Sequence, residues 1–452
     1  MAKPEKLIVV GGNAAGMAAA TAARRRRPDL DITLVEQSGR IATANCSAPA
    51  YLDGRIVQVS ALENLTPQNA SEQYSLNVLT GHQALEIQPR AHRLAVRNAA
   101  TGQTFDLPYD RLILSTGARP IRPSVPNVGA RGILALRSLD DAEEIRRWLE
   151  IRRPSTFVVI GTGTIAQVCA EALKSHGLEI HFIGREEGLM EDLEKPISEC
   201  LMQALLDAGI HVHFAENITG FQVSLENEVE AVEFPGQTLR CQGVLIAMGV
   251  APNTDLARSA GLRLGVQETL QVDRRLGTSR AGIYACGDCT HSFFRTTNKP
   301  FYWPLATTAS RQGRQAGEIA AGARGEDPGT LATRLWTCLG LQVARVGLSS
   351  KLARDMGVKH RVTHASAASK PGMYGGHSMD LALISDPETG RLLGAQIIGK
   401  EGVHARLCAL SAAISGKLTL KEVENLDLGY SPELAALWDP VQIAGRLGRK
   451  RP

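Results

Sequence analysis

One cysteine, Cys46, stands in a sequence context typical of a redox-active thiol. It follows an apolar stretch that ends near Glu36 and a turn at Gly39, and it precedes a predicted helix with Pro49 in its first turn, where proline is favoured. The positive end of a helix favours the thiolate, which is the form of cysteine that attacks disulfides.

The position five residues after Cys46 decides which redox partner is available. Dithiol flavoenzymes with a C-x-x-x-x-C pair need a second cysteine there, but the residue is Tyr51. A redox-active Cys46 must therefore pair with a small thiol, a sulfane sulfur or an oxygen-derived group. The alternative is an inert buried cysteine, which is the usual fate of a free cysteine.

The segment before Cys46 has the pattern of a dinucleotide-binding strand, turn and helix. An apolar strand at residues 7–10 leads into a tight turn and an alanine-rich helix. Glycines let the turn approach a pyrophosphate held at the helix N-terminus. A second strand ends in an acid about 25 residues after the first glycine, where a carboxylate can bind ribose hydroxyls. The predicted cofactor-binding residues of this unit are Gly11, Gly12, Ala14, Ala15, Gly16 and Glu36.

The same pattern begins again at Gly161, 150 residues after Gly11, which predicts a second dinucleotide site with a different ligand. Gly184 replaces the acid of the first unit, and Arg185 follows it. This pair favours a 2′-phosphate, and hence NADPH over NADH, although Arg185 fits a solvated loop cation equally well. The predicted cofactor-binding residues here are Gly161, Gly163, Ile165 and Arg185.

Three further buried strands end in glycine turns. Residues 109–120, with Thr116 and Gly117, and residues 243–253, with Gly249, look like crossings between the two nucleotide units. Residues 282–288 form a strand that ends in Gly287 and Asp288. The Asp288 carboxylate can accept hydrogen bonds from a polyol such as a ribitol, or it can cap a helix.

Composition is that of a globular protein with more than one domain. The 452 residues are 44% hydrophobic and 21% charged, and the net charge of +4 comes without the aromatic interleaving of a single-strand nucleic-acid binder. We expect no leader ahead of the first strand, and no run approaches the roughly 18 apolar residues that span a bilayer. Eight scattered cysteines suit a reducing compartment, so the predicted location is the cytoplasm. The single C-x-x-C, at Cys286 and Cys289, lacks further ligands, and no metal site is predicted.

The sequence pattern changes near residue 326. Predicted strands with a hairpin turn at residues 386–390, followed by two helices, indicate an α+β domain with apolar faces for dimer formation. The predicted fold is therefore α/β, with two Rossmann-like dinucleotide-binding domains and a C-terminal α+β dimerisation domain. The first domain comprises 1–118 and 253–325, the second 119–252, and the third 326–452.

Taken together, these features resemble the pyridine nucleotide-disulfide oxidoreductases, and within them the single-cysteine branch of coenzyme A disulfide reductases, NADH oxidases, NADH peroxidases and polysulfide reductases. The resemblance runs from about Leu7 to Leu447. Its most specific segments are residues 44–49, 285–288, 394–399, 430–432 and 438–440.

The resemblance implies FAD on the first unit, NAD(P)H on the second, and a homodimer in which the C-terminal domain completes the partner's active site. The further predicted cofactor-binding residues are Asn45, Thr116, Gly117, Gly249, Gly287, Asp288 and Ala306. Within the branch, the coenzyme A disulfide reductases are most similar at Asn45 and Cys46, at the basic helix end with Arg24 and Arg25, and at Tyr374. Coenzyme A is thus an expected ligand of Asn45, Arg24 and Arg25, although Arg25 also suits a helix C-terminus.

Four positions depart from the family pattern. Oxidase and peroxidase members carry a histidine where this chain has Ala14, which makes oxygen and peroxide chemistry less expected. Val168 replaces a glutamate and Thr164 an aromatic residue near the second glycine turn, and Glu433 replaces a proline after residues 430–432.

The leading hypothesis is a reductase of small disulfides, persulfides or polysulfides, with catalysis at Cys46 and proton donation by Tyr374 and Tyr430 from the other subunit. Ordinary packing is the alternative for either tyrosine. Two further hypotheses are an NAD(P)H oxidase or peroxidase that cycles Cys46 through a sulfenic acid, and a flavin-binding redox sensor with little turnover. No nucleic acid or membrane is expected as a partner.

Overall fold

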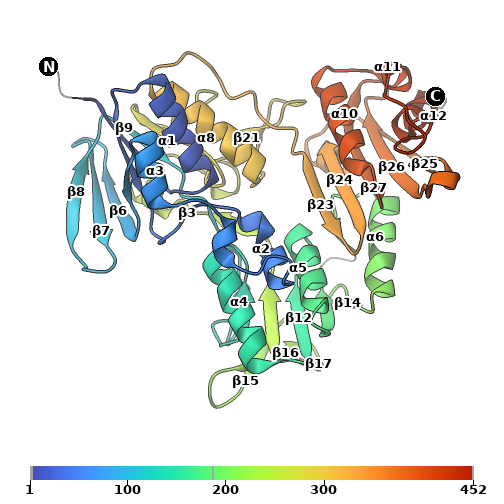
Figure 1. The fold of residues 1–452 in the computed structure, drawn as a ribbon, viewed down its shortest axis with the longest axis horizontal. Coiled ribbons are helices and arrows are strands. Elements are labelled where there is room, and N and C mark those ends of the chain that lie inside the picture. The colour runs from blue at the N-terminus through green and yellow to red at the C-terminus, as the bar shows by residue number, and fades with distance from the viewer. Residues whose placement is uncertain (1–3, 186–187, 450–452) are drawn as a thin grey trace.

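The computed structural model describes residues 4–185 and 188–449. Its first part is a five-stranded parallel sheet with the order β20-β9-β1-β2-β5. The strands are β1 (Lys6–Val10), β2 (Asp31–Val35), β5 (Asn77–Leu79), β9 (Arg111–Leu114) and β20 (Ile283–Ala285). Helices α1 (Ala14–Arg26), α3 (Pro67–Tyr74) and α8 (Ala306–Ala320) accompany it (Figure 1). The other elements of this part are β3 (Ile41–Thr43), β4 (Glu63–Leu65), β6 (His82–Gln88), β7 (Arg93–Asn98), β8 (Thr104–Pro108), β21 (Ser292–Phe293), β22 (Pro300–Phe301) and α7 (Asp255–Ser259).

Helices α1 and α8 lie side by side with their backbones in contact, although almost 300 residues separate them in sequence (Figure 1). A Cβ at Gly313 would lie 2.1 Å from the carbonyl oxygen of Ala15, and one at Gly317 would lie 2.0 Å from that of Ala19. The alanines on α1 and the glycines on α8 therefore allow an approach that larger side chains would prevent.

A second five-stranded parallel sheet has the order β11-β18-β12-β13-β14. Its strands are β11 (Ile133–Ala135), β12 (Thr156–Ile160), β13 (Glu179–Ile183), β14 (His211–His213) and β18 (Gly243–Ile246). Helices α4 (Leu139–Arg152), α5 (Thr164–Lys174) and α6 (Lys195–Asp207) pack here, beside an antiparallel sheet of β15 (Gly220–Val223), β16 (Val229–Phe234) and β17 (Gln237–Arg240). Ser138 and Asp141 form a capping box that fixes the start of α4.

The two crossings between the nucleotide units lie next to each other. Strand β10 (Ala118–Pro120) pairs antiparallel with β19 (Val250–Pro252). The chain thus leaves the first unit and returns to it through one two-stranded link. The domain limits themselves stay a prediction.

The C-terminal part is a five-stranded antiparallel sheet with the order β23-β24-β27-β26-β25. Its elements are β23 (Arg334–Cys338), β24 (Leu341–Gly347), α9 (Ser350–Asp355), β25 (Arg361–Ala368), β26 (Ser378–Ser385), β27 (Leu392–Gly399), α10 (Val403–Ser415), α11 (Leu420–Glu424) and α12 (Pro440–Arg449). The expected hairpin joins β26 and β27, where the Asp386 carboxylate accepts hydrogen bonds from the Glu388 and Thr389 amides. The fold class predicted from sequence is confirmed.

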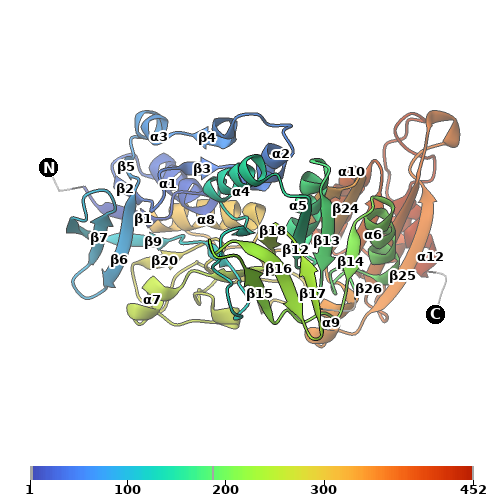
Figure 2. The same cartoon turned by 90° about the horizontal axis from the view of Figure 1, so that it is seen from below.

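The three parts follow one another along the molecule, with the second nucleotide unit between the first sheet and the C-terminal sheet (Figure 2). Among the described residues, no helix has the length and apolar character needed to cross a bilayer.

Substituting Gly317 tests the contact between α1 and α8. We expect Gly317→Ala to lower the free energy of unfolding by about 2 kcal/mol, because overpacking outweighs the roughly 1 kcal/mol by which alanine favours a helix. Thermal and urea unfolding measure this change. The control is Gly129→Ala, where a Cβ meets nothing within 4 Å; equal stability of the two variants would contradict the close contact.

Candidate functional site

Cys46 lies in a 3₁₀ turn, η1 (Asn45–Ser47), that runs directly into α2 (Ala48–Leu52). Pro49 occupies the first turn of α2, as predicted. Cys46 is exposed, whereas Tyr51, five residues later, is buried. The thiol is therefore open to a small partner, and a tyrosine fills the place where a second cysteine would stand.

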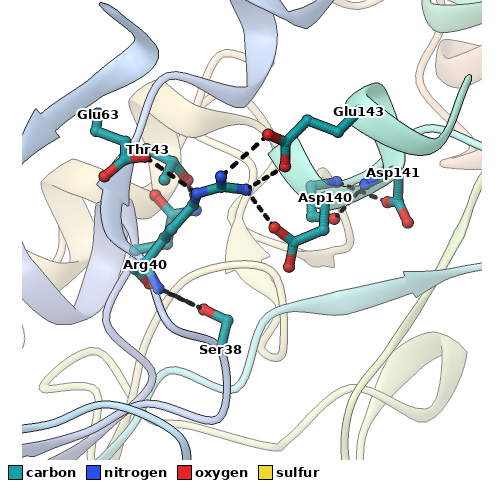
Figure 3. A network of polar contacts seen from close by, with 9 residues as sticks. Ser38, Arg40, Thr43, Glu63, Asp140, Asp141 and Glu143 are labelled. Carbon is teal, nitrogen blue, oxygen red and sulfur yellow. Dashed lines mark hydrogen bonds and ion pairs between the residues drawn. The ribbon is translucent and has the colours of Figure 1, made fainter. Parts of the chain in front are cut away.

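Arg40 fastens the Cys46 segment to the second nucleotide unit (Figure 3). Its Nε donates to Glu63 at 3.0 Å, and its two terminal nitrogens donate to the Glu143 carboxylate of α4 at 2.7 and 3.2 Å. Asp140, also on α4, completes the set of carboxylates around the guanidinium. These carboxylates raise the pKa of Arg40 above its ordinary value, with the hydrogen bond to Glu143 the largest cause. The ion pairs hold the loop before Cys46 against the start of α4.

A cavity of about 230 Å³ opens beside this loop. The first glycine turn, Glu36, Thr43, Asn45 and the end of β9 contribute to its walls, and so do Arg137 and Asp140 from the second unit. The predicted residues Gly11, Gly12, Glu36, Asn45, Thr116 and Gly117 all line it. Residues near the N-terminus and residues near position 140 thus line the same cavity.

The cavity has the features of a dinucleotide site. Gly11 has a φ of +100°, and a Cβ there would lie 2.2 Å from the Ser115 carbonyl oxygen. A Cβ at Gly16 would lie 1.7 Å from the Gly11 carbonyl oxygen, so only glycine permits this turn. The side-chain oxygen of Asn45 is buried and has no hydrogen-bond partner among the described residues. A polar ligand in the cavity would satisfy it, and the residues therefore fit FAD.

Glu36 lies on the wall of the cavity, and its contact with a ribose stays a prediction. Its carboxylate accepts the Gly12 amide at 2.7 Å and the Ser38 amide at 2.8 Å, on the wall of the cavity. Ala14 and Ala15 begin α1, and the Asn13 side chain caps its first amide.

Asp288 pairs with Arg137 at 2.6 Å, a contact that the sequence analysis missed. Arg137 also donates to the Ala118 carbonyl at 3.1 Å, so one guanidinium joins both nucleotide units at the cavity wall. No helix begins at Asp288, and the helix-capping alternative is therefore wrong. Gly287 approaches α1, since a Cβ there would lie 2.7 Å from that of Ala15, and Ala306 is the first residue of α8.

Thr116, Gly117 and Gly249 belong to the link between the nucleotide units. The Thr116 hydroxyl donates to the Asn253 carbonyl at 2.6 Å, and the Asn253 amide nitrogen donates to the Gly117 carbonyl at 2.9 Å. Gly249 accepts the Ile121 amide at 3.0 Å with a φ of +99°.

The second glycine turn repeats the geometry of the first. Gly161 has a φ of +119°, and a Cβ there would lie 2.3 Å from the Ala247 carbonyl oxygen. A Cβ at Gly163, the N-cap of α5, would meet nothing within 4 Å, which leaves room for a phosphate. At Gly184 a Cβ would lie 2.6 Å from the Thr162 side chain. This crowding explains why no acid stands after β13. Ile165 on α5 and Arg185 after β13 are exposed.

A cluster around Trp303 was also missed by the sequence analysis. The guanidinium of Arg334 lies 4.5 Å from the Trp303 ring centre, that of Arg345 lies 4.8 Å from it, and Arg334 donates to the Thr164 hydroxyl at 3.2 Å. Burial lowers the pKa of Arg334 to about 10. A cation from the C-terminal sheet is therefore placed at the N-terminus of α5, where a nucleotide phosphate would bind.

The substrate-binding prediction for Arg24 is not supported. Its guanidinium donates to the carbonyl oxygens of Tyr74, Pro28, Leu30 and Ser75 at 2.6 to 3.0 Å, so it holds the end of α1 in place. Arg25 is exposed.

Tyr374 and Tyr430 both belong to the C-terminal part of the chain. Tyr374 ends the 3₁₀ turn η4 (Gly372–Tyr374) between β25 and β26, and Tyr430 lies between α11 and α12. Both side chains are about half exposed. They share their part of the chain with the exposed apolar residues Met373, Leu434, Leu437 and Trp438.

The other cysteines contrast with Cys46. Burial raises the pKa of Cys169, Cys241 and Cys338 to about 12, and it also raises the pKa of Cys286 and Cys289. Cys200 is half-buried and its pKa is raised too, while Cys408 is exposed.

Alkylation with iodoacetamide at pH 8 tests this contrast. We expect rapid labelling of Cys46 and Cys408, because a raised pKa and burial keep the other thiols protonated and shielded. Peptide mass spectrometry locates the label. Urea should expose the remaining sites, and labelling of Cys169 in the native protein at the rate of Cys46 would contradict the structure.

Comparisons with known proteins agree with this geometry. The sequence profile of the family described as Pyridine nucleotide-disulphide oxidoreductase matches residues 5–313, and that of its dimerisation domain matches residues 336–440. The chain is 29% identical to the NAD(P)H sulfur oxidoreductase (CoA-dependent) of Pyrococcus furiosus, over 98% of this chain and 99% of that protein. It is 27% identical to an NADH oxidase of Methanocaldococcus jannaschii, over 99% of each. The solved structure of a NAD-dependent persulfide reductase from A. fulgidus is similar with a TM-score of 0.94 and 29% identity, covering 98% of this chain and 83% of that one.

Proposed function

Because the chain belongs to the pyridine nucleotide-disulphide oxidoreductase family, we propose that it reduces coenzyme A disulfide, coenzyme A persulfide or polysulfide with NAD(P)H at Cys46. The family prediction made from the sequence is confirmed. The observation that carries the proposal is one exposed thiol beside a dinucleotide cavity, with the buried Tyr51 in place of a second cysteine. The names of the sulfur-reducing relatives support it.

Bound FAD would supply the transfer of two electrons from NAD(P)H to sulfur. The residues that would hold it are the first glycine turn, Glu36, Asn45, Thr116 and Gly117, because they line the cavity. The second glycine turn and Arg334 would hold the phosphates of the nicotinamide cofactor.

Cys46 acts as the nucleophile. Its thiolate attacks one sulfur of a disulfide RSSR, the S–S bond breaks, and the products are a Cys46 mixed disulfide and RS⁻. Tyr374 or Tyr430 of the partner subunit donates a proton to the leaving RS⁻. Two electrons from NAD(P)H and a proton would then split the mixed disulfide into the Cys46 thiolate and a second RSH. The net reaction consumes one NAD(P)H and one proton and yields two RSH and NAD(P)⁺. The half-exposed side chains of Tyr374 and Tyr430, both in the C-terminal part, suit a role across a dimer interface.

Oxygen or peroxide reduction is the alternative that the oxidase relative favours. A sulfenic acid on the exposed Cys46 would be its intermediate. Ala14 offers a methyl group at the start of α1, so no proton donor stands there, and the sulfur reaction remains the first proposal.

Three finer proposals accompany this function. The crowded Gly184 and the exposed Arg185 favour NADPH. Arg25 and Asn45 are the remaining candidates for contacts with coenzyme A. The dimerisation domain and its exposed apolar residues support a homodimer, and eight free cysteines suit the cytoplasm.

Anaerobic turnover with NADH or NADPH tests the function. With coenzyme A disulfide or polysulfide, we expect Cys46→Ser to lower the rate by roughly 10³-fold or more, because the nucleophile is lost. Cys408→Ser, which removes the other exposed thiol, should keep the wild-type rate. If only oxygen or peroxide supports turnover, the oxidase or peroxidase hypothesis replaces the sulfur proposal. If FAD binds and no acceptor supports turnover, the redox sensor is the remaining hypothesis.

Mixed dimers test the role of the tyrosines. We expect the double variant Tyr374→Phe, Tyr430→Phe to lose about 10²-fold in rate with FAD bound. A dimer of this variant with Cys46→Ser has one complete site if the tyrosines serve the partner's Cys46, and it should regain about half of the wild-type rate. A mixed dimer as inactive as its parents would place the tyrosines in the site of their own chain or outside it.

A further inference from the structure

A group of histidines on the second nucleotide unit has no part in the function above. Glu179 and His181 lie on β13, and His211 and His213 lie on the neighbouring edge strand β14. The strands pair in parallel with His181 opposite His211. Side chains two residues apart in a strand point to the same face, so all four gather on one face of the sheet.

The ligand atoms of Glu179, His181 and His211 converge. They lie within 4.8 Å of one another, with the Glu179 Oε1 3.3 Å from the His181 Nε2 and 3.4 Å from the His211 Nε2. The His181 and His211 rings stack with centres 4.7 Å apart. Two imidazole nitrogens and a carboxylate oxygen are a common ligand set for Zn²⁺.

His213 supports this arrangement from the side. Its Nε2 lies 3.0 Å from the His181 Nδ1, so the second nitrogen of His181 is held while the first faces Glu179 and His211. A histidine that binds a metal usually has its other nitrogen fixed in this way.

Within the described part of the chain, no lysine or arginine forms an ion pair with Glu179. The ion-pair partners of this carboxylate are the two imidazoles, and the Thr156 hydroxyl donates to its other oxygen at 3.3 Å. About half of the side chains of Glu179 and His211 is exposed, so an ion can enter from solvent. The site has three protein ligands and leaves a position for water.

We propose that Glu179, His181 and His211 bind a divalent transition-metal ion of the Zn²⁺ type, with His213 as a positioning residue. The ion would tie the edge strand β14 to β13. The carbonyl of His213 also accepts the Gly184 amide at 2.9 Å, which connects the edge strand to the residue that follows β13. The proposal revises the expectation that the chain has no metal site.

Metal titration of the flavin-loaded protein without a histidine tag tests the proposal. The exposed Cys46, and Cys408 with its Sγ 3.6 Å from the His404 Nε2, are rival ligands, so the experiment uses the Cys46→Ser, Cys408→Ser background. We expect one Zn²⁺ per chain by elemental analysis, and one Co²⁺ with the visible absorption of a four- or five-coordinate site. Absence of this ion in the background variant would overturn the proposal.

Substitutions then assign the ligands. We expect His211→Ala and Glu179→Gln each to weaken Co²⁺ binding by at least about tenfold, and His213→Ala to weaken it while the ion-to-chain ratio stays at one. The control is His364→Ala, which removes an exposed histidine of the C-terminal sheet. Circular dichroism without metal checks that each variant is folded. Equal affinity of His211→Ala and His364→Ala would show that the ion binds elsewhere.

Discussion

This structure depends on one steric constraint. Several main-chain segments pack so closely that no side chain fits between them. Gly11 and Gly16 close the first turn on themselves and on Ser115, Gly287 meets α1, and Gly313 brings α8 onto the same helix. The cavity wall, the cysteine segment and the last strand of the first sheet are therefore positioned from one helix. The second glycine turn repeats the principle at Gly161 against Ala247.

Charged side chains then join parts that the backbone alone leaves separate. Arg40 links the cysteine segment to α4, Arg137 links the second unit to Asp288, and Arg334 links the C-terminal sheet to α5. Each is a partly or largely buried cation that has either carboxylate partners or an aromatic face. Burying such groups is costly unless they are paired or held by hydrogen bonds, so these contacts specify how the units meet.

The sequence alone predicts the local parts of this picture well. Gly11, Gly161 and Glu36 could be placed because a glycine turn between a strand and a helix has a fixed pattern over a few residues. Arg40, Arg137 and Arg334 could not, since Asp140, Asp288 and Thr164, their respective partners in another part of the fold, lie 100 to 170 residues away. Arg24 was misread for the same reason, because two of its carbonyl partners lie at the end of α3, about 50 residues later. The histidines of β13 and β14 could be recognised as a group only from the register of the two strands.

The burial of the remaining cysteines has a consequence for the proposed reaction with polysulfides and persulfides. Such compounds also convert other accessible thiolates to persulfides. Cys169, Cys241, Cys286, Cys289 and Cys338 are enclosed in the cores of the sheets, with raised pKa values. The fold thus shields these thiols from the proposed chemistry, and it leaves Cys46 and Cys408 as the exposed thiols.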